Sequence, residues 1–151
     1  MISLCSLWFV MALSCAAFDS VSKEENPVIE EPTVTTGTVR FVALGDAGEG
    51  NQAQRDVAAA IKTVCAERGC DFALYLGDNF YDTGVESVDD IQFIEKFEEP
   101  YAELDFPFYA VLGNHDYGLG SDWDRPDPQI AYAEVSEKWI MPDRYHSHIS
   151  E

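Results

Sequence analysis

Hydrophobic residues gather in three short runs along this chain, and a glycine follows each run. The runs are rich in β-branched and aromatic residues and cover Val39–Leu44, in which Arg40 is the one polar residue, Phe72–Leu76 and Phe108–Leu112. Continuous apolar runs of this length predict strands that are buried on both faces of a sheet. The chain is therefore expected to contain three buried strands, each ending in a tight turn.

Between the first two runs, the apolar positions follow helical spacing from Asn51 to Arg68, and Gly69 follows as a C-terminal cap. The apolar positions of this predicted helix are Ala53, Val57, Ala60, Ile61 and Val64. A strand, a helix and a second strand within about 40 residues match a βαβ unit, whose strands pair in parallel.

Two further helices are predicted after the second run. One occupies 87–100, with Asp89 and Asp90 in its first turn, where acidic side chains suit the helix dipole. The other begins at Asp127, as its capping residue, and continues through Trp139. Each of these helices is expected to stop at a proline.

Each apolar run is followed by a glycine and then by a residue with a side-chain oxygen, at Gly45-Asp46, Gly77-Asp78 and Gly113-Asn114. Because the carboxyl ends of parallel strands meet at one edge of a sheet, these side chains are expected to converge. Carboxylate and amide oxygens bind hard or borderline cations, and the glycines allow sharp turns. One such dipeptide alone would be an ordinary turn, but three together predict a metal site.

Two of these loops carry further chemistry. Asp78 can bridge two cations through its two carboxylate oxygens, and Tyr81 returns to the same side, where its phenolate would ligate a trivalent ion. The alternative is that Tyr81 is a half-buried packing residue. His115, next to Asn114, can hydrogen-bond a phosphate or donate a proton to a leaving group, which phosphoester cleavage requires.

The formal net charge of the 151 residues is -19, so the chain has no basic surface to neutralise a phosphate backbone. Nucleic acid is therefore not expected as a partner. A phosphorylated substrate would have to be attracted locally by bound cations.

The N-terminal residues predict export. Residues 1–17 form an apolar block ending in small residues, as a secretory signal peptide does, and the block is too short to span a membrane. This predicts an extracellular or periplasmic protein, with lipid attachment at Cys15 as the weaker alternative. Residues 18–37 are expected to form a disordered acidic linker, and residues 38–151 the folded domain.

Two of the four cysteines, Cys65 and Cys70, lie beyond the predicted signal peptide and linker. An exported chain with two cysteines favours a disulfide between them. The alternative is a pair of buried free thiols near the end of a helix.

The three motifs together resemble a known family. Gly45-Asp46-Ala47-Gly48, Gly77-Asp78-Asn79-Phe80-Tyr81 and Gly113-Asn114-His115-Asp116 look like the ordered signature of the calcineurin-like metallophosphoesterases. The tyrosine narrows the resemblance to purple acid phosphatases of the small, tartrate-resistant type, over about Thr38 to Tyr145. The resemblance implies an α/β fold, a four-layer β-sandwich flanked by helices, of which this chain would be an incomplete N-terminal portion.

The resemblance also implies a role for each motif residue. Asp46 would bind iron(III), Asp78 would bridge two metals, and Tyr81 would ligate the iron(III) and give a purple colour. Asn114 would bind the second, divalent metal, which would be iron, zinc or manganese, and His115 would assist the leaving group. The implied reaction is hydrolysis of small phosphate monoesters at acidic pH by attack of a metal-bound hydroxide.

The chain also departs from the family pattern. Ala47 stands where animal members often carry tryptophan and Tyr117 where they often carry histidine, while Asp116 matches an acidic position to which we assign a supporting role. The family completes its site with histidines from two later motifs. His146 and His148 lack the glycine of those motifs and are expected to begin a strand without a metal role. The chain is therefore expected to be part of a longer enzyme and inactive by itself.

Two other functions stay open. The first is another metallophosphoesterase, a diesterase or nucleotidase, although those relatives do not share Tyr81. The second is a non-catalytic acidic module that holds calcium with the carboxylates of loop 121–127. That loop lacks the glycine and the closing glutamate of an EF-hand, so a solvated loop is the better interpretation. The sequence does not indicate an oligomeric state.

Overall fold

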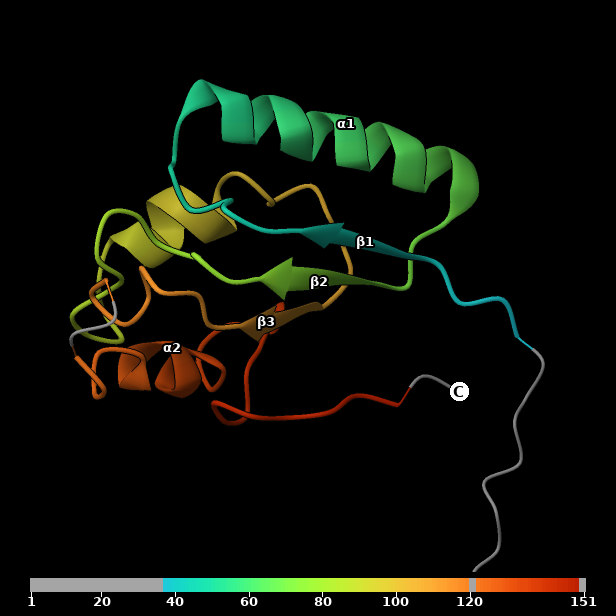
Figure 1. The fold of residues 1–151 in the computed structure, drawn as a ribbon. Coiled ribbons are helices and arrows are strands. Elements are labelled where there is room, and N and C mark those ends of the chain that lie inside the picture. The colour runs from blue at the N-terminus through green and yellow to red at the C-terminus, as the bar shows by residue number, and fades with distance from the viewer. Residues whose placement is uncertain (1–36, 120–121, 150–151) are drawn as a thin grey trace, which may run out of the picture. The chain divides into compact units, whose positions relative to one another are not determined.

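The computed structural model describes residues 37–119 and 122–149. The predicted signal peptide and nearly all of the predicted linker lie outside these residues. The strands form one parallel sheet, in the order β1 (Phe41–Leu44), β2 (Phe72–Leu76), β3 (Phe108–Val111) and β4 (Trp139–Ile140). The connections carry helix α1 (Gln52–Arg68), a π-helical turn η1 (Ile94–Glu98) and helix α2 (Asp127–Tyr132). Figure 1 shows α1 running alongside β1 and β2.

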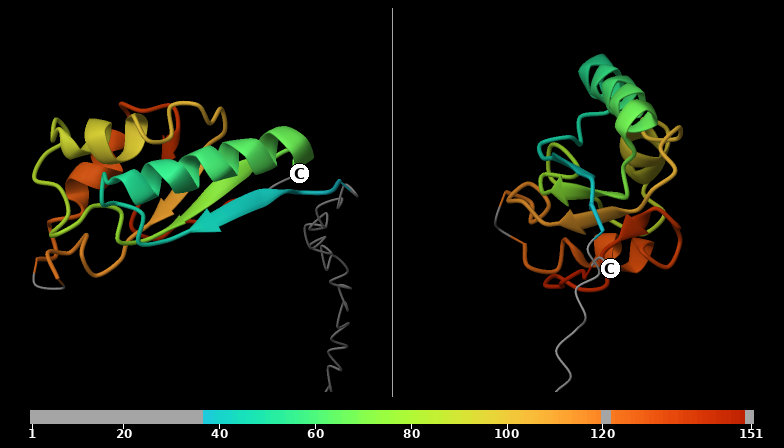
Figure 2. Two further views of the ribbon diagram at one scale, coloured as in Figure 1. Left: turned by 90° about the horizontal axis from the view of Figure 1, so that it is seen from above. Right: turned by 90° about the vertical axis from the view of Figure 1, so that its right-hand side faces the viewer.

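The three predicted strands are present and parallel, and the register aligns Val42, Ala73 and Phe108 across the sheet. Each strand lies beside the next one in the chain, so right-handed crossovers place all the helical elements on one face. Figure 2 shows this arrangement from two further directions. The core lies between that face and the helices, and its members include Ala58, Tyr75, Phe97, Phe108, Tyr132 and Trp139.

The expectation that the strands are buried on both faces is wrong for the described residues. On the face without helices, Phe41 is 52% exposed, Leu76 54% and Val111 40%. The reason is that all the crossovers use the same side of the sheet. The segment after β4 covers only part of the other face, where the ring of His148 stacks on Tyr109 at a centroid distance of 3.9 Å.

Helix α1 has the predicted ends. The Asn51 side chain accepts a hydrogen bond from the Gln54 N–H at 3.0 Å, and Gly69 adopts φ 75° beyond the last turn. Its predicted buried face is wrong, because Val57 and Val64 are about half exposed while Gln54 is buried. Gln54 can be buried because its amide donates to the Lys96 carbonyl oxygen at 2.6 Å.

The helix predicted over 87–100 is present only over residues 92–98, which include η1, and turns replace its first part. The Asp90 carboxylate accepts hydrogen bonds from the backbone N–H groups of Glu86 and Gln92, at 3.0 Å each. A side chain that bonds to the backbone on both sides competes with helix formation. The acidic residues therefore stabilise a turn here rather than the first turn of a helix.

The helix predicted from Asp127 through Trp139 is also wrong in extent. Helix α2 ends at Tyr132, and Trp139 lies in β4, where its ring is fully buried. The Ser136 hydroxyl oxygen accepts from the Trp139 N–H at 3.3 Å, which ends the helical region in a turn. Asp127 does not cap the helix with its side chain, which pairs with Arg144 instead.

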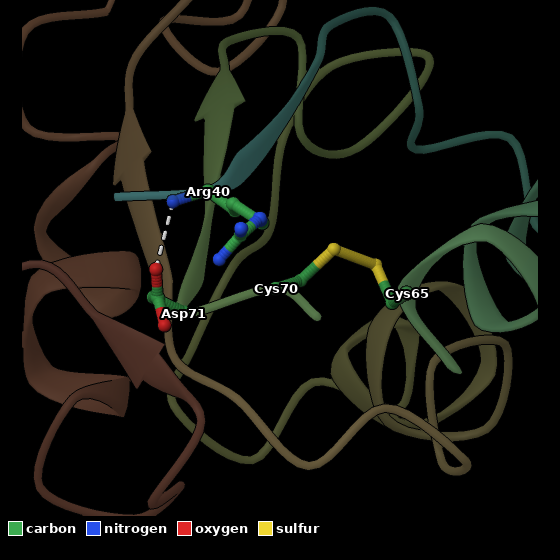
Figure 3. The surroundings of a disulfide bond; sticks show 4 residues. All are labelled: Arg40, Cys65, Cys70 and Asp71. Atoms are coloured by element: carbon green, nitrogen blue, oxygen red, sulfur yellow. Dashed lines mark hydrogen bonds between the residues drawn. A yellow bond between two sulfur atoms is a disulfide. The ribbon is translucent and has the colours of Figure 1, made fainter. Parts of the chain in front are cut away.

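Cys65 and Cys70 form a disulfide, with their Cα atoms 5.1 Å apart, as predicted (Figure 3). The free-thiol alternative is therefore wrong. The bond joins the last turn of α1 to the residues that lead into β2. Beside it, the Asp71 carboxylate accepts from the Arg40 N–H at 2.7 Å, which ties the start of β2 to β1.

His146 and His148 do not begin a strand in the described part of the chain, so the expected strand start is wrong. His146 Nε2 lies 2.8 Å from the Ala110 carbonyl oxygen, and His148 packs on Phe72 and Tyr109. Tertiary contacts with the sheet, rather than strand pairing, hold this segment.

Candidate metal centre

Three of the predicted ligand oxygens converge beyond the carboxyl ends of β1 and β2. The Tyr81 hydroxyl donates to Asp46 Oδ1 at 2.7 Å, and Asp78 Oδ2 lies 3.2 Å from the same hydroxyl oxygen. Asp46 follows β1, whereas Asp78 and Tyr81 follow β2. Residues that are 35 positions apart in the sequence are thus joined at one point.

The sharp turns were predicted at the glycines, but two of the three left-handed residues in the Gly-Asp and Gly-Asn dipeptides are aspartates. Left-handed conformations fall on the aspartates themselves, with φ 53° at Asp46 and 52° at Asp78, and on Gly77 with φ 92°. Aspartate tolerates this region better than most residues. Gly113 is needed for another reason, since a Cβ atom there would lie 2.2 Å from Asp78 Oδ1.

The carboxylate of Asp78 faces two loops. Its Oδ1 accepts a hydrogen bond from the His115 N–H at 2.9 Å, while its Oδ2 lies toward Tyr81. Two oxygens that point in different directions are what a bridging carboxylate requires. The structure therefore places Asp78 between the second and third ligand loops.

The ring of His115 lies against Tyr81, with a centroid distance of 4.4 Å. Its Nδ1 is 2.6 Å from the Asp82 carbonyl oxygen, which can only accept, so Nδ1 carries a proton. The other ring nitrogen, Nε2, is then the atom available to a substrate.

The fifth predicted site residue, Asn114, is exposed and lines a hollow of about 420 Å³ with Leu112, Tyr117 and Trp123. Its side chain makes no hydrogen bond to Asp46, Asp78 or Tyr81. The structure therefore joins four of the five predicted residues by direct contacts and leaves Asn114 at the edge of the group.

The donors fit a hard cation. Burial, the hydrogen bond with Asp46 and the charge on Asp78 raise the pKa of Tyr81 well above its ordinary value, so its hydroxyl proton is held between two carboxylates. A trivalent cation in this position would replace that proton and compensate the negative charges. Within 37–119 and 122–149, no group of three or more His, Cys, Asp and Glu side chains is placed to hold a metal. The donor set at this centre includes the phenol oxygen of Tyr81.

Two carboxylates of loop 121–127 make other contacts. Asp122 Oδ1 accepts from the Asp124 N–H at 3.0 Å, and Asp127 pairs with Arg144. These contacts do not favour the calcium-binding alternative.

The model of the calcineurin-like phosphoesterase family matches residues 39–149 of this chain. The chain belongs to the calcineurin-like phosphoesterases. This confirms the family that the three motifs predicted, and the metallophosphoesterase fold is represented here by one parallel sheet with helices.

Among curated proteins, the chain is similar to tartrate-resistant acid phosphatase type 5 of Mus musculus, with 35% identity over 133 residues, 80% of this chain and 38% of the relative. It is also 41% identical to purple acid phosphatase 3 of Arabidopsis thaliana over 90 residues, 58% of this chain and 25% of that protein. A solved structure described as "GAP50 the anchor in the inner membrane complex of Plasmodium" is similar with a TM-score of 0.60 and 26% identity, over 74% of this chain and 37% of that chain. The chain thus spans less than two fifths of these proteins.

Behind the ligand loops of this calcineurin-like domain lies a buried polar group formed by Asn79, Asp116 and Gln129. A supporting role was expected for Asp116, but its partners were not predicted. Asp116 is fully buried, and its carboxylate accepts from the N–H groups of Asn79 and Gly113 and from the Gln129 side chain. Burial raises the pKa of Asp116 even though these hydrogen bonds favour its charged form. The signal in the sequence was the place of Asn79 and Asp116 inside the motifs, and nothing in the sequence predicted that Gln129 would contact both of them.

Proposed function

We propose that this protein is a phosphatase that hydrolyses small phosphate monoesters at acidic pH with iron(III) and a divalent metal. The observation that carries the proposal is the convergence of two carboxylate oxygens on the Tyr81 hydroxyl, Asp46 Oδ1 at 2.7 Å and Asp78 Oδ2 at 3.2 Å. A phenol held between two carboxylates suits a trivalent ion, and the names of the similar proteins, which are acid phosphatases, support the same reaction class.

The proposal assigns the ligands as follows. Asp46 and Tyr81 hold the iron(III), Asp78 bridges, and Asn114 holds the divalent metal, which is iron, zinc or manganese. When bound, such a pair neutralises phosphate charge and lowers the pKa of bound water. The bridging role of Asp78 is supported by its two oxygens, which face Tyr81 and the His115 N–H.

His115 serves the leaving group in this proposal. Its Nδ1 is committed to the Asp82 carbonyl oxygen, and the ring is held against Tyr81. In acid a histidine carries protons on both ring nitrogens, so Nε2 can donate to the oxygen that leaves the phosphorus. The Asp82 contact therefore sets which nitrogen acts.

The proposal includes export of the protein to the extracellular space or the periplasm. The Cys65–Cys70 disulfide supports it, because disulfides persist in oxidising compartments. No helix in the described part of the chain is long and apolar enough to cross a membrane. The lipid-anchor alternative at Cys15 concerns residues outside the described part.

The test uses the protein expressed from its complete reading frame, called the full-length protein below. Asp78→Asn should lose bound iron and lower kcat for 4-nitrophenyl phosphate by about 10²-fold or more. The exposed Asp89, changed to Asn, is the matched control and should keep both properties. Equal activity of the two variants would refute the assignment of Asp78. A wild-type preference for bis(4-nitrophenyl) phosphate would favour the diesterase alternative.

A further inference from the structure

Asn79, Asp116 and Gln129 form a fully buried polar cluster behind the candidate metal centre, and each is 0% exposed. Buried polar side chains destabilise a fold unless they are hydrogen-bonded. A cluster in this position therefore needs a structural or functional reason.

The carboxamide of Gln129 spans two loops. Its Oε1 accepts from Asn79 Nδ2 at 3.0 Å, and its Nε2 donates to Asp116 Oδ1 at 2.9 Å. The orientation of the amide is fixed, because a carboxylate needs a donor and the Asn79 NH₂ needs an acceptor. Asn79 lies between Asp78 and Tyr81 in the sequence, and Asp116 follows His115. One side chain thus connects both loops that carry predicted ligands.

Gln129 is itself held by the core. Its backbone carbonyl oxygen accepts from the indole N–H of Trp139 at 2.8 Å, and Trp139 is buried in β4. Asn79 Nδ2 also donates to the Val111 carbonyl oxygen at 2.9 Å, whereas Asn79 Oδ1 has no hydrogen-bond partner within the described residues. The orientation of Asn79 is therefore set by two donated bonds, of which one goes to Gln129.

The two loops are packed too closely to shift independently. The His115 N–H lies 2.9 Å from Asp78 Oδ1, and a Cβ atom at Gly113 would be 2.2 Å from that oxygen. A small change in the spacing of the loops therefore moves Asp78 relative to Asn114, the residue assigned to the divalent metal.

We propose that Gln129 is a positioning residue for the metal centre. The Asp116 carboxylate already accepts from the Asn79 N–H at 3.1 Å, and Gln129 orients both partners of this contact by bonding to the Asp116 carboxylate and to the Asn79 side chain. Gln129 thereby fixes the spacing between the loop of Asp78 and Tyr81 and the loop of Asn114 and His115. This inference rests on the proposed function, since it concerns the same ligands. According to this inference, helix α2 helps to determine metal affinity although it contributes no predicted ligand.

The experiment compares two variants of the full-length protein within one helix. Gln129→Met keeps the size of the side chain but removes both hydrogen bonds. Tyr132→Phe, the matched control, removes one hydrogen bond from a buried residue of α2, that of its hydroxyl to Glu98 at 3.2 Å, and does not touch the ligand loops. The measurements are the melting temperature of the metal-free protein, the affinity for Zn²⁺ in competition with a chelator, and the visible absorption of the iron-loaded protein.

Both variants are expected to lower the melting temperature of the metal-free protein. Only Gln129→Met is expected to weaken Zn²⁺ binding, by about 10- to 100-fold, as loss of the hydrogen bonds that orient metal ligands does. It should also shift the visible absorption maximum, while Tyr132→Phe should keep the affinity within about twofold.

Wild-type Zn²⁺ affinity and an unchanged absorption maximum in Gln129→Met would overturn the inference and leave Gln129 a packing residue. If Gln129→Met does not fold, Gln129→Glu carries the test, because it keeps an acceptor for Asn79 and replaces the amide that donates to Asp116 with a carboxyl group that repels it when ionised. It should again bind Zn²⁺ at least about tenfold more weakly. A wild-type protein that binds neither iron nor zinc would instead overturn the proposed function, and this inference with it.

Discussion

The sharpest structural prediction concerns Gly48, which lies where the first ligand loop presses on the second. A Cβ atom built on Gly48 would lie 2.0 Å from the Asn79 carbonyl oxygen, 2.3 Å from the Asn79 carbonyl carbon and 2.6 Å from the Phe80 nitrogen. All three are backbone atoms, so no side-chain rotation relieves the overlap. Gly48→Ala must therefore push the two loops apart.

The size of the effect follows from these distances. Non-bonded carbon atoms pack about 3.5 to 4.0 Å apart, and the Cβ atom would lie 2.3 Å from the Asn79 carbonyl carbon, so the loops must separate by about 1 to 2 Å. Overpacking of this kind costs about 1 to 3 kcal/mol. The separation also weakens the hydrogen bond from the Tyr81 N–H to the Gly48 carbonyl oxygen, which is 3.0 Å long, at a further cost of about 1 kcal/mol. Gly48→Ala should lower the free energy of unfolding by about 2 to 4 kcal/mol.

The same displacement moves Tyr81 away from Asp46. Misplacement by about 1 Å can lower a reaction rate by about 10²-fold. Urea unfolding, bound iron and kcat for 4-nitrophenyl phosphate would be measured on the full-length protein. Gly37→Ala is the control, because an added Cβ atom there meets nothing within 4 Å. If Gly48→Ala matched Gly37→Ala in all three measurements, the close loop contact inferred here would be wrong.

Three further predictions concern other parts of the chain. Mass measurement after alkylation without reductant should find Cys65 and Cys70 unlabelled, and two labelled cysteines would contradict the disulfide. Burial raises the pKa of Asp90, but hydrogen bonds from Gln92 and Glu86 outweigh it and hold the pKa below its ordinary value. Asp90→Asn should therefore reduce stability to urea at pH 7, and the difference from wild type should vanish as the pH falls through the folded-state pKa; a difference that persists at pH 2 would contradict this. A polypeptide of only these 151 residues, supplied with iron and zinc, should show no phosphatase activity beside the active full-length protein, because few ligands hold the divalent metal; comparable turnover would contradict this expectation.

The strands and the ligand loops were predictable because local signals carried them. The continuous apolar runs predicted β1, β2 and β3, and the glycine motifs after them predicted that Asp46, Asp78 and Tyr81 would meet. Asn51 and Gly69 marked the ends of α1 by their own capping chemistry. In each case the residues that determine the structure are close together in the sequence.

The features that were missed depend on partners that are distant in the sequence. Gln54 lies on the buried face of α1, where an apolar residue was expected. It can be buried because its amide donates to the Lys96 carbonyl oxygen, 42 residues later in the sequence. Trp139 lies in a strand instead of the predicted helix, because it pairs with β3 and its ring packs in the aromatic core. Gln129 acquires its place through residues 50 and 13 positions away. Periodicity and propensity do not contain such pairings, since tertiary contacts decide them.

The central claim is that Tyr81, with Asp46 and Asp78, holds iron(III), and the visible absorption spectrum of the iron-loaded full-length protein tests it most directly. A phenolate bound to iron(III) absorbs visible light, so the wild-type protein should be purple. Tyr81→Phe should lose the band while its far-ultraviolet circular dichroism stays unchanged. A colourless wild-type protein with bound iron(III), or a Tyr81→Phe variant that keeps the purple band, would contradict the assignment of the metal centre.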